Sequence, residues 1–380
     1  MTAALGLASC SQDGPDQLQV EASTEPVFHS EGNPERLSEW NLVRIDAGDF
    51  LLNDGVIAYD LNSALFTDYA HKLRTVWLPE GQPAEYDPEK TFDFPVGTVI
   101  SKTFYYPRGE GDADAKLAVA LAEDATATRL TDGFTLADVQ LIETRLLIHR
   151  EEGWVALPYV WNAEQSDAML KRTGDAKPMR LTMADGSAED FTYIVPNANQ
   201  CAGCHATNAT TRAIEPIGPK ARHLNRDFAY AEGSANQLTQ WSNLGLLSDA
   251  PDAEDAPRNA VWNDASSSSL DERARAYLDI NCAHCHNRVG SADTSGLLLE
   301  HDAPMGPSLG RCKLPIAAGK GTGGRSFGIV PGKPEDSIFT YRMESRDPSI
   351  MMPELGRSLA HEEGAALIAD WIASLEGACT

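Results

Sequence analysis

Two copies of one short pattern restrict this chain more than any other feature. Cysteine, two further residues, a second cysteine and a histidine occur in that order at 201–205 and again at 282–286. The two-residue gap sets the thiols about one helical turn apart, and the next residue points its imidazole to the same side. Each pattern therefore places two thiols and an imidazole on one face of the chain.

These residue types are the ones that hold haem c. Two thiols add to the vinyl groups on one side of a porphyrin, and the imidazole binds the iron. A zinc ribbon could use paired cysteines, but it would not require a histidine after each pair, and it would suit a reducing compartment better. We therefore expect two covalently bound haems c. Their attachment residues and iron ligands are Cys201, Cys204 and His205 for the first and Cys282, Cys285 and His286 for the second.

The sixth ligand of the second haem is expected from the segment that follows it. The candidates are Met305, Met343, Met351 and Met352. Met352 is favoured, because Met352-Pro353 stands just before the last predicted helix, a position that resembles the axial methionine of monohaem class I cytochromes. A thioether favours ferrous iron and raises the reduction potential. Packing in a core is the ordinary alternative for each methionine.

The first haem lacks such a donor, because no methionine lies between His205 and His286. His223 is one candidate ligand, with a surface or supporting role as its alternative. A methionine from the preceding segment (Met169, Met179 or Met183) is a second option. An open coordination site is the third.

The sequence predicts an α+β chain with more than one domain. A β-rich N-terminal domain would end in the first haem segment, and an all-α domain like class I cytochrome c would hold the second. Strands are expected at 96–106 and 191–195, and as a hairpin over 144–149 and 154–161. Ser269 and Glu272 have the form of a capping box before a helix that runs into the second motif, and another helix is expected at 359–376. The expected segments are 1–10, signal-like; 11–38, a flexible tether; 39–247, β-rich; 248–269, a linker; and 270–380, the second haem domain.

The three cysteines outside the two motifs bear on whether the chain is exported from the cytoplasm. Leu7-Ala8-Ser9-Cys10 looks like a bacterial lipobox, in which Cys10 would be acylated, although the segment lacks a basic start. An incidental cysteine in a frayed terminus is the alternative. Haem c is attached outside the cytoplasm, where disulfides persist. We therefore expect the two cysteines left over, Cys312 and Cys379, to be bridged.

The net charge of −25 at pH 7 limits the partners. An acidic surface repels phosphate backbones, so nucleic acid is an unsuitable partner, and a basic redox protein fits better. Acidity that only keeps an exported protein soluble is the alternative. No run of 18 apolar residues occurs, so membrane attachment is expected by the lipid anchor only.

Several segments together resemble an uncharacterised family of bacterial dihaem c-type cytochromes, typically encoded beside parallel β-helix proteins. The resemblance covers roughly 40–376. It implies an exported dihaem cytochrome, with a parallel β-helix protein as a candidate partner, and no settled reaction. The segments that carry it are Tyr59–Asn62, Leu65–Ala70, Phe94–Phe104, Tyr159–Asn162, Pro196–Gln200, Leu224–Asp227, Ile329–Pro334 and Met352–Gly356.

Residues 40–230 alone are also similar to the lysine-crosslinked cytochromes that oxidise hydroxylamine. In that family a lysine on a Gly-Thr…Lys strand bonds to the porphyrin, and the iron keeps an open face. The matching residue here is Lys102. An ordinary surface lysine is the alternative.

Electron transfer in the cell envelope is the function expected first. The two haems would form a short relay between a donor and an acceptor, on a lipoprotein in the periplasm or at the outer membrane. The alternative is a haem enzyme whose first haem has an open site and whose second haem relays electrons. An adaptor held to a β-helix partner is compatible with the relay.

Overall fold

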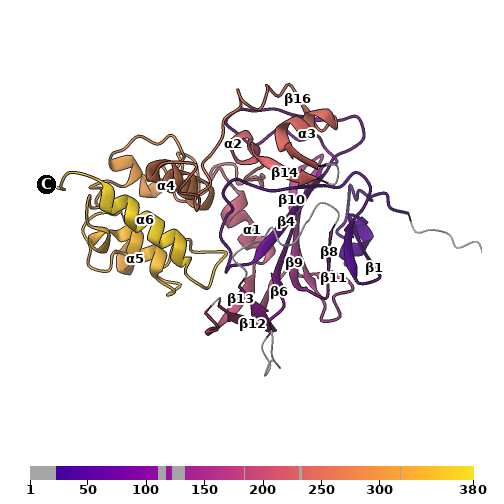
Figure 1. Cartoon of the computed structure of the whole chain (residues 1–380), viewed down its shortest axis with the longest axis horizontal. Helices are drawn as coiled ribbons and strands as arrows, with labels where there is room; N and C mark the ends of the chain where they lie inside the picture. The colour runs from indigo at the N-terminus through magenta and orange to yellow at the C-terminus, as the bar shows by residue number, and fades with distance from the viewer. Residues whose placement is uncertain (1–22, 110–116, 122–132, 184, 231–232, 317) are drawn as a thin grey trace, which may run out of the picture.

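The largest element of the computed structural model is a six-stranded antiparallel sheet in the order β11-β10-β9-β6-β4-β3 (Figure 1). The structure describes residues 23–109, 117–121, 133–183, 185–230, 233–316 and 318–380. Cys10, the predicted lipidation site, lies outside them. The strands of this sheet are β3 (Ile57–Tyr59), β4 (His71–Trp77), β6 (Val99–Pro107), β9 (Val139–Arg150), β10 (Gly153–Trp161) and β11 (Ala168–Leu170).

The predicted strands lie in or beside this sheet. β6 matches the β-branched and aromatic run at 96–106, and β9 pairs with β10 as the predicted hairpin, closing with Arg150 opposite Gly153. Gly153 has φ +113°, a left-handed value that favours glycine at this turn. The expected β-rich N-terminal part agrees with this architecture.

Two three-stranded sheets flank the large one. They run in the orders β1-β2-β8 and β13-β12-β7. Their strands are β1 (Val43–Asp46), β2 (Asp49–Leu52), β8 (Gly133–Thr135), β7 (Leu117–Ala120), β12 (Asp175–Thr182) and β13 (Ala188–Val195). Two two-stranded pairs complete the sheets: β14 (Asp227–Tyr230) with β15 (Gly233–Asn236), and β5 (Ala84–Glu85) with β16 (Leu247–Ser248).

The prediction of an all-α C-terminal domain like class I cytochrome c is wrong. The described residues are mostly β-sheet with six short α-helices, and three of these helices lie after residue 269. Glycine and proline between 287 and 357 disfavour regular helix, and that segment is mostly irregular chain and short 3-10 turns. The helices are α1 (Ala198–His205), α2 (Ala221–Leu224), α3 (Gln237–Asn243), α4 (Leu270–Leu278), α5 (Ile338–Glu344) and α6 (Glu362–Ser374).

The helices at the two ends of the C-terminal part form for local reasons. The side chain of Ser269 accepts a hydrogen bond from the backbone N–H of Glu272, as the predicted capping box requires. In α6, Leu367, Ile368 and Trp371 are buried together on one face, which packs against α4. These contacts form a small core of their own beside the sheets.

The loop between β3 and β4 joins the sheet part to the C-terminal part. The backbone N–H of Phe66 donates to the side-chain oxygen of Asn281, at 2.8 Å, next to the second motif. One carboxylate oxygen of Asp68 accepts from the backbone N–H groups of Ser358 and Leu359, each at 2.7 Å. Figure 1 shows α1 between the sheets and the C-terminal helices. Among the described residues, no helix is long and apolar enough to cross a membrane.

Candidate haem sites

The first motif forms the C-terminal half of α1. β13 leads into this helix, whose start is capped by the side chain of Asn197, an acceptor for the N–H of Gln200. Cys201 and Cys204 are free thiols. Burial raises the pKa of Cys204 to about 11, so both groups of a covalent attachment site are present as neutral thiols in a largely dry setting.

The imidazole of His205 is oriented by one hydrogen bond. Its Nδ1–H donates to the carbonyl oxygen of Glu215 at 2.9 Å, and the N–H of Glu215 donates back to the carbonyl of His205 at 2.8 Å. A carbonyl only accepts, so the proton sits on Nδ1, and Nε2 keeps its lone pair. Burial lowers the pKa of His205 to about 3, which keeps the ring neutral. This is the form in which histidine binds a metal.

Beside the first motif lies a row of cationic side chains on the large sheet. Lys102 on β6 stands opposite Arg74 on β4 and Arg145 on β9, so these side chains share one face of the sheet, and Lys72 joins them two residues along β4. We call Lys72, Arg74, Lys102 and Arg145 the cationic row.

The members of the cationic row differ in their partners. Arg74 binds the carboxylate of Asp60 at 2.8 Å, and Arg145 binds Glu143 through two hydrogen bonds at 2.6 and 2.8 Å. The Lys102 ammonium lies 5.4 Å from the ring centre of Phe104. Burial, with Arg145 and Arg74 nearby, lowers the pKa of Lys102 to about 7, and the neighbouring Cys204 thiol opposes this shift.

The second motif follows α4 on a wide turn, Asp279–Ala283, and closes with one helical turn. The N–H groups of Cys285 and His286 both donate to the carbonyl of Cys282, at 3.1 and 2.9 Å. Buried Asp279 anchors the start of the turn by accepting hydrogen bonds from His223 Nε2 at 2.7 Å and from Asn259 at 3.1 Å. His223, a candidate ligand of the first haem, therefore has one ring nitrogen engaged with this carboxylate.

His286 is oriented in the same way as His205. Its Nδ1–H donates to the hydroxyl of Ser295 at 3.1 Å, and that hydroxyl donates to the carbonyl of Ala292 at 2.6 Å. Because the serine proton is used on Ala292, its oxygen is the acceptor for His286. Burial lowers the pKa of His286 to about 4, so Nε2 is again available to a metal at neutral pH.

A cavity of about 710 Å³ opens beside the second motif, within the size range of cofactor pockets. Cys282, Cys285 and His286 line it together with Met352, and with Met343. Met351 is buried, and Met305 packs against the C-terminal core. The predicted attachment residues, the predicted iron ligand and the favoured methionine therefore line one cavity. The lining also contains charged side chains, among them Lys313, Arg342 and Glu354, and apolar ones: Leu278, Leu297, Leu299, Ile338 and Phe339.

The two motifs are in contact with each other. The thiol of Cys285 lies 3.6 Å from the carbonyl oxygen of Gly203, and Gly203 and Cys204 line the same cavity as the second motif. A second contact joins the segments that follow the motifs, since the N–H of Ala209 donates to the carbonyl of Val289 at 2.6 Å.

The residues present fit two haems c. Each motif offers two free thiols and one imidazole whose Nδ1 is already bonded, and the second faces a cavity whose lining is partly apolar. Within the described part of the chain, no group of three or more His, Cys, Asp or Glu side chains is arranged to bind a metal ion directly. Each haem iron would take only one or two ligands from the protein.

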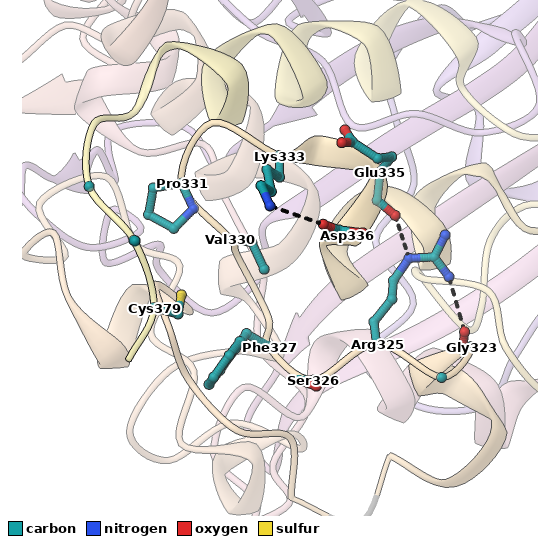
Figure 2. Close-up of a pocket in the computed structure, with 13 residues that line it drawn as sticks. Gly323, Arg325, Ser326, Phe327, Val330, Pro331, Lys333, Glu335, Asp336 and Cys379 are labelled. Carbon is teal, nitrogen blue, oxygen red and sulfur yellow. Dashed lines mark hydrogen bonds and ion pairs between the residues drawn. The ribbon is translucent and has the colours of Figure 1, made fainter.

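Cys312 and Cys379, the remaining cysteine pair, are joined by a disulfide that closes a span of 67 residues. A second cavity, of about 580 Å³, lies beside Cys379. Figure 2 shows its polar wall, where Lys333 pairs with Asp336 and the Arg325 guanidinium bonds to the carbonyls of Glu335 and Gly323. Neither motif contributes to it.

Several neighbours of the motifs were not predicted from the sequence. They are Lys72, Arg74, Arg145, Glu215, His284, Ser295 and His361. The sequence could have indicated part of the cationic row, because Lys72 and Arg74 are two residues apart and therefore share a face of one strand. Lys102 and Arg145 come to lie beside them only through the strand register, which the sequence does not give. Glu215 and Ser295 carry no local signal.

Comparison of this chain with protein-family models, with curated proteins and with solved structures finds no match. The function of the two sites has to be inferred from their own residues.

Proposed function

We propose that this chain is a dihaem c-type cytochrome that transfers electrons in the bacterial cell envelope, with a His/Met-ligated second haem. One observation carries the proposal. Two complete thiol–thiol–imidazole sets lie in contact, with the Cys285 thiol 3.6 Å from the Gly203 carbonyl. Each haem iron, when bound, supplies one-electron chemistry between the ferrous and ferric states.

The protein's own residues support a carrier in three ways. Glu215 and Ser295 fix the tautomer and direction of the two imidazoles, as partners of metal-bound histidines do. Met352, on the wall of the same cavity as His286, offers a soft donor that raises the potential of the second haem. The contact between the motifs brings the two sites near enough for a short relay.

The setting proposed is outside the cytoplasm. The Cys312–Cys379 disulfide is the kind of bond that persists there, and haem c attachment also takes place there. Acylation at Cys10 would hold the protein to the periplasmic or outer membrane surface. A net charge of −25 favours a redox partner with a basic contact surface. The sequence resemblance adds a parallel β-helix protein as a candidate partner.

Production in a host with a cytochrome c maturation system tests the proposal. We expect two haems per chain that resist acid–acetone extraction, and one haem in each of the double variants Cys201→Ala/Cys204→Ala and Cys282→Ala/Cys285→Ala. The control pair is Cys312→Ala/Cys379→Ala, which should keep both haems. A wild-type protein that binds zinc and no haem would rule the proposal out.

A second candidate function is a haem enzyme with an open first site, and Lys102 is the observation that favours it. This lysine lies near His205 and Cys204, and it forms no ion pair with a carboxylate among the described residues. Glu143 supplies some negative charge to Lys102, but this carboxylate is bonded to Arg145, so a partly buried cation at Lys102 is incompletely compensated, which is costly. A small anion bound at the first haem beside Lys102 would relieve that cost. Binding of carbon monoxide to the first haem of the reduced wild-type protein would favour this candidate.

A further inference from the structure

The residues that the sequence suggested as sixth ligand of the first haem are poorly placed for that role. Nε2 of His223 is bonded to Asp279, and although its buried Nδ1 has no partner among the described residues, His223 does not line the cavity that Gly203 and Cys204 share. Met179 is fully buried in the core cluster that contains Phe104 and Tyr193, against which Met183 packs, and Met169 is on edge strand β11. A better donor is found in the second motif.

His284 occupies an interior position of the second motif, where haem attachment does not call for a histidine. The hydrogen bonds from Cys285 and His286 to the carbonyl of Cys282 make this segment one helical turn. Cys282 and His286 are four residues apart and share a face of that turn. His284 is two residues from each of them, so its side chain projects from the opposite face of that turn.

That opposite face is turned toward the first motif. His284 lines the same cavity as Gly203 and Cys204, and the adjacent Cys285 contacts Gly203 directly. His284 also lies within electrostatic reach of His205 and of Lys102.

The imidazole of His284 is in the right state to bind a metal. Its Nδ1 is buried and has no hydrogen-bond partner among the described residues, so one polar atom of this ring is unsatisfied. A buried ring nitrogen without a partner is available to a metal ion. Neutral imidazole is the ligand form of histidine. A buried imidazole with an unpartnered nitrogen, in a cavity lining shared with the first motif, is a suitable axial donor.

We propose that His284 supplies the sixth ligand to the iron of the first haem, across from His205. The inference rests on the proposed function and deepens it. The peptide His284–Cys285–His286 would then carry a ligand of each iron within three residues, and the first iron would be closed to small molecules. Such a haem suits outer-sphere electron transfer rather than substrate binding.

The spin state of the fully loaded protein tests this assignment. In the wild type we expect both ferric haems to be low-spin by electron paramagnetic resonance. His284→Ala should convert one haem per chain to high-spin, let the reduced form bind one carbon monoxide per chain, and return to low-spin when imidazole is added. Haem content should stay at two. His301→Ala, a half-buried histidine outside the cavity lining, is the matched control and should behave as wild type.

Two further variants separate the outcomes. His284→Met keeps a donor, and should give a second iron–thioether absorption band in place of the lost histidine. His223→Ala should leave both haems low-spin; a high-spin signal there, and not in His284→Ala, would assign the ligand to His223 and overturn the inference. An unchanged low-spin spectrum in His284→Ala, or a high-spin haem in the wild type, would overturn it while the cytochrome function stands. Absence of covalent haem from the wild type would instead defeat the proposed function.

Discussion

The thiol of Cys285 lies 3.6 Å from the carbonyl oxygen of Gly203, although the two residues are 82 positions apart in the chain. This contact places the attachment edges of the two candidate haem sites side by side. Haems attached at these edges would exchange electrons through a few atoms of protein. The relationship between the two motifs, more than either motif alone, makes a relay the function that the residues support best.

Gly203 is the position at which this contact can be altered with least change elsewhere. A Cβ atom on Gly203 would lie 2.8 Å from Cδ1 of Leu355, the end of a flexible side chain. We expect Gly203→Leu to press on Leu355 and disturb the packing beside this contact, at a cost of about 1–3 kcal/mol in stability, as overpacking does. Both haems should be retained, and electron transfer between them, measured by flash photolysis, should slow. Adding Leu355→Ala should restore part of the rate; equal rates in all three proteins would show that this contact is not on the electron path.

Met352 is expected to set the potential of the second haem. Met352→Ala should abolish the iron–thioether charge-transfer band and lower that haem's potential, because a soft ligand of ferrous iron is removed. Met351→Ala is the matched control, because this neighbour is buried and does not line the cavity. Met343→Ala tests the other methionine on the cavity wall. Loss of the band in Met343→Ala alone would transfer the ligand assignment to that residue.

Ser295 should affect the reduction potential of the same haem through its hydrogen bond to the other ring nitrogen of His286. Its hydroxyl accepts the Nδ1–H of His286 at 3.1 Å, which makes that imidazole a stronger electron donor. Ser295→Ala removes the acceptor, so the potential of the second haem should rise, in the direction opposite to Met352→Ala. A redox titration of both variants measures the two changes. Ser374→Ala, at the end of α6, is the control; an identical change there would indicate a general effect of the C-terminal core.

The sequence correctly predicted the local elements that depend on residues close together in the chain. The strand at β6, the β9–β10 hairpin and the capping box at Ser269 follow from β-branched runs, a glycine turn and a side chain three residues from its partner. The all-α C-terminal domain was wrong, because a helix–motif–helix order was extended across a segment that folds mainly as irregular chain.

Contacts between distant parts of the chain were beyond such reasoning. The contact of Gly203 with Cys285, and the cationic row, depend on strand register and on docking of α1 between two parts of the molecule. His284 illustrates the difference. Its place in the motif can be read directly, but its closeness to His205 cannot.

Asp68 gives a prediction that does not depend on haem. Its side chain is 2 % exposed and joins the sheet part to the C-terminal part through Ser358 and Leu359. Burial raises the pKa of Asp68 from 3.8 to about 6, although the two backbone N–H groups and the charges of Arg357 and Lys72 oppose the change. The folded protein therefore binds this proton more tightly than the unfolded chain does. Stability from this group is complete below about pH 4 and is lost as the pH rises through 6.

We expect Asp68→Asn to remove this pH dependence while keeping an acceptor oxygen for the two N–H groups. The free energy of unfolding of the wild type, relative to the variant, should fall by up to about 3 kcal/mol between pH 4 and pH 7, because a tenfold difference in proton affinity corresponds to about 1.4 kcal/mol. Urea titrations at pH 4, 5, 6 and 7 measure the difference. Asp185→Asn, at a solvent-exposed turn, is the control, since a hydrogen bond from Ser187 lowers the pKa of Asp185 instead. A constant difference between wild type and Asp68→Asn across this range would show that Asp68 stays ionised in its buried site.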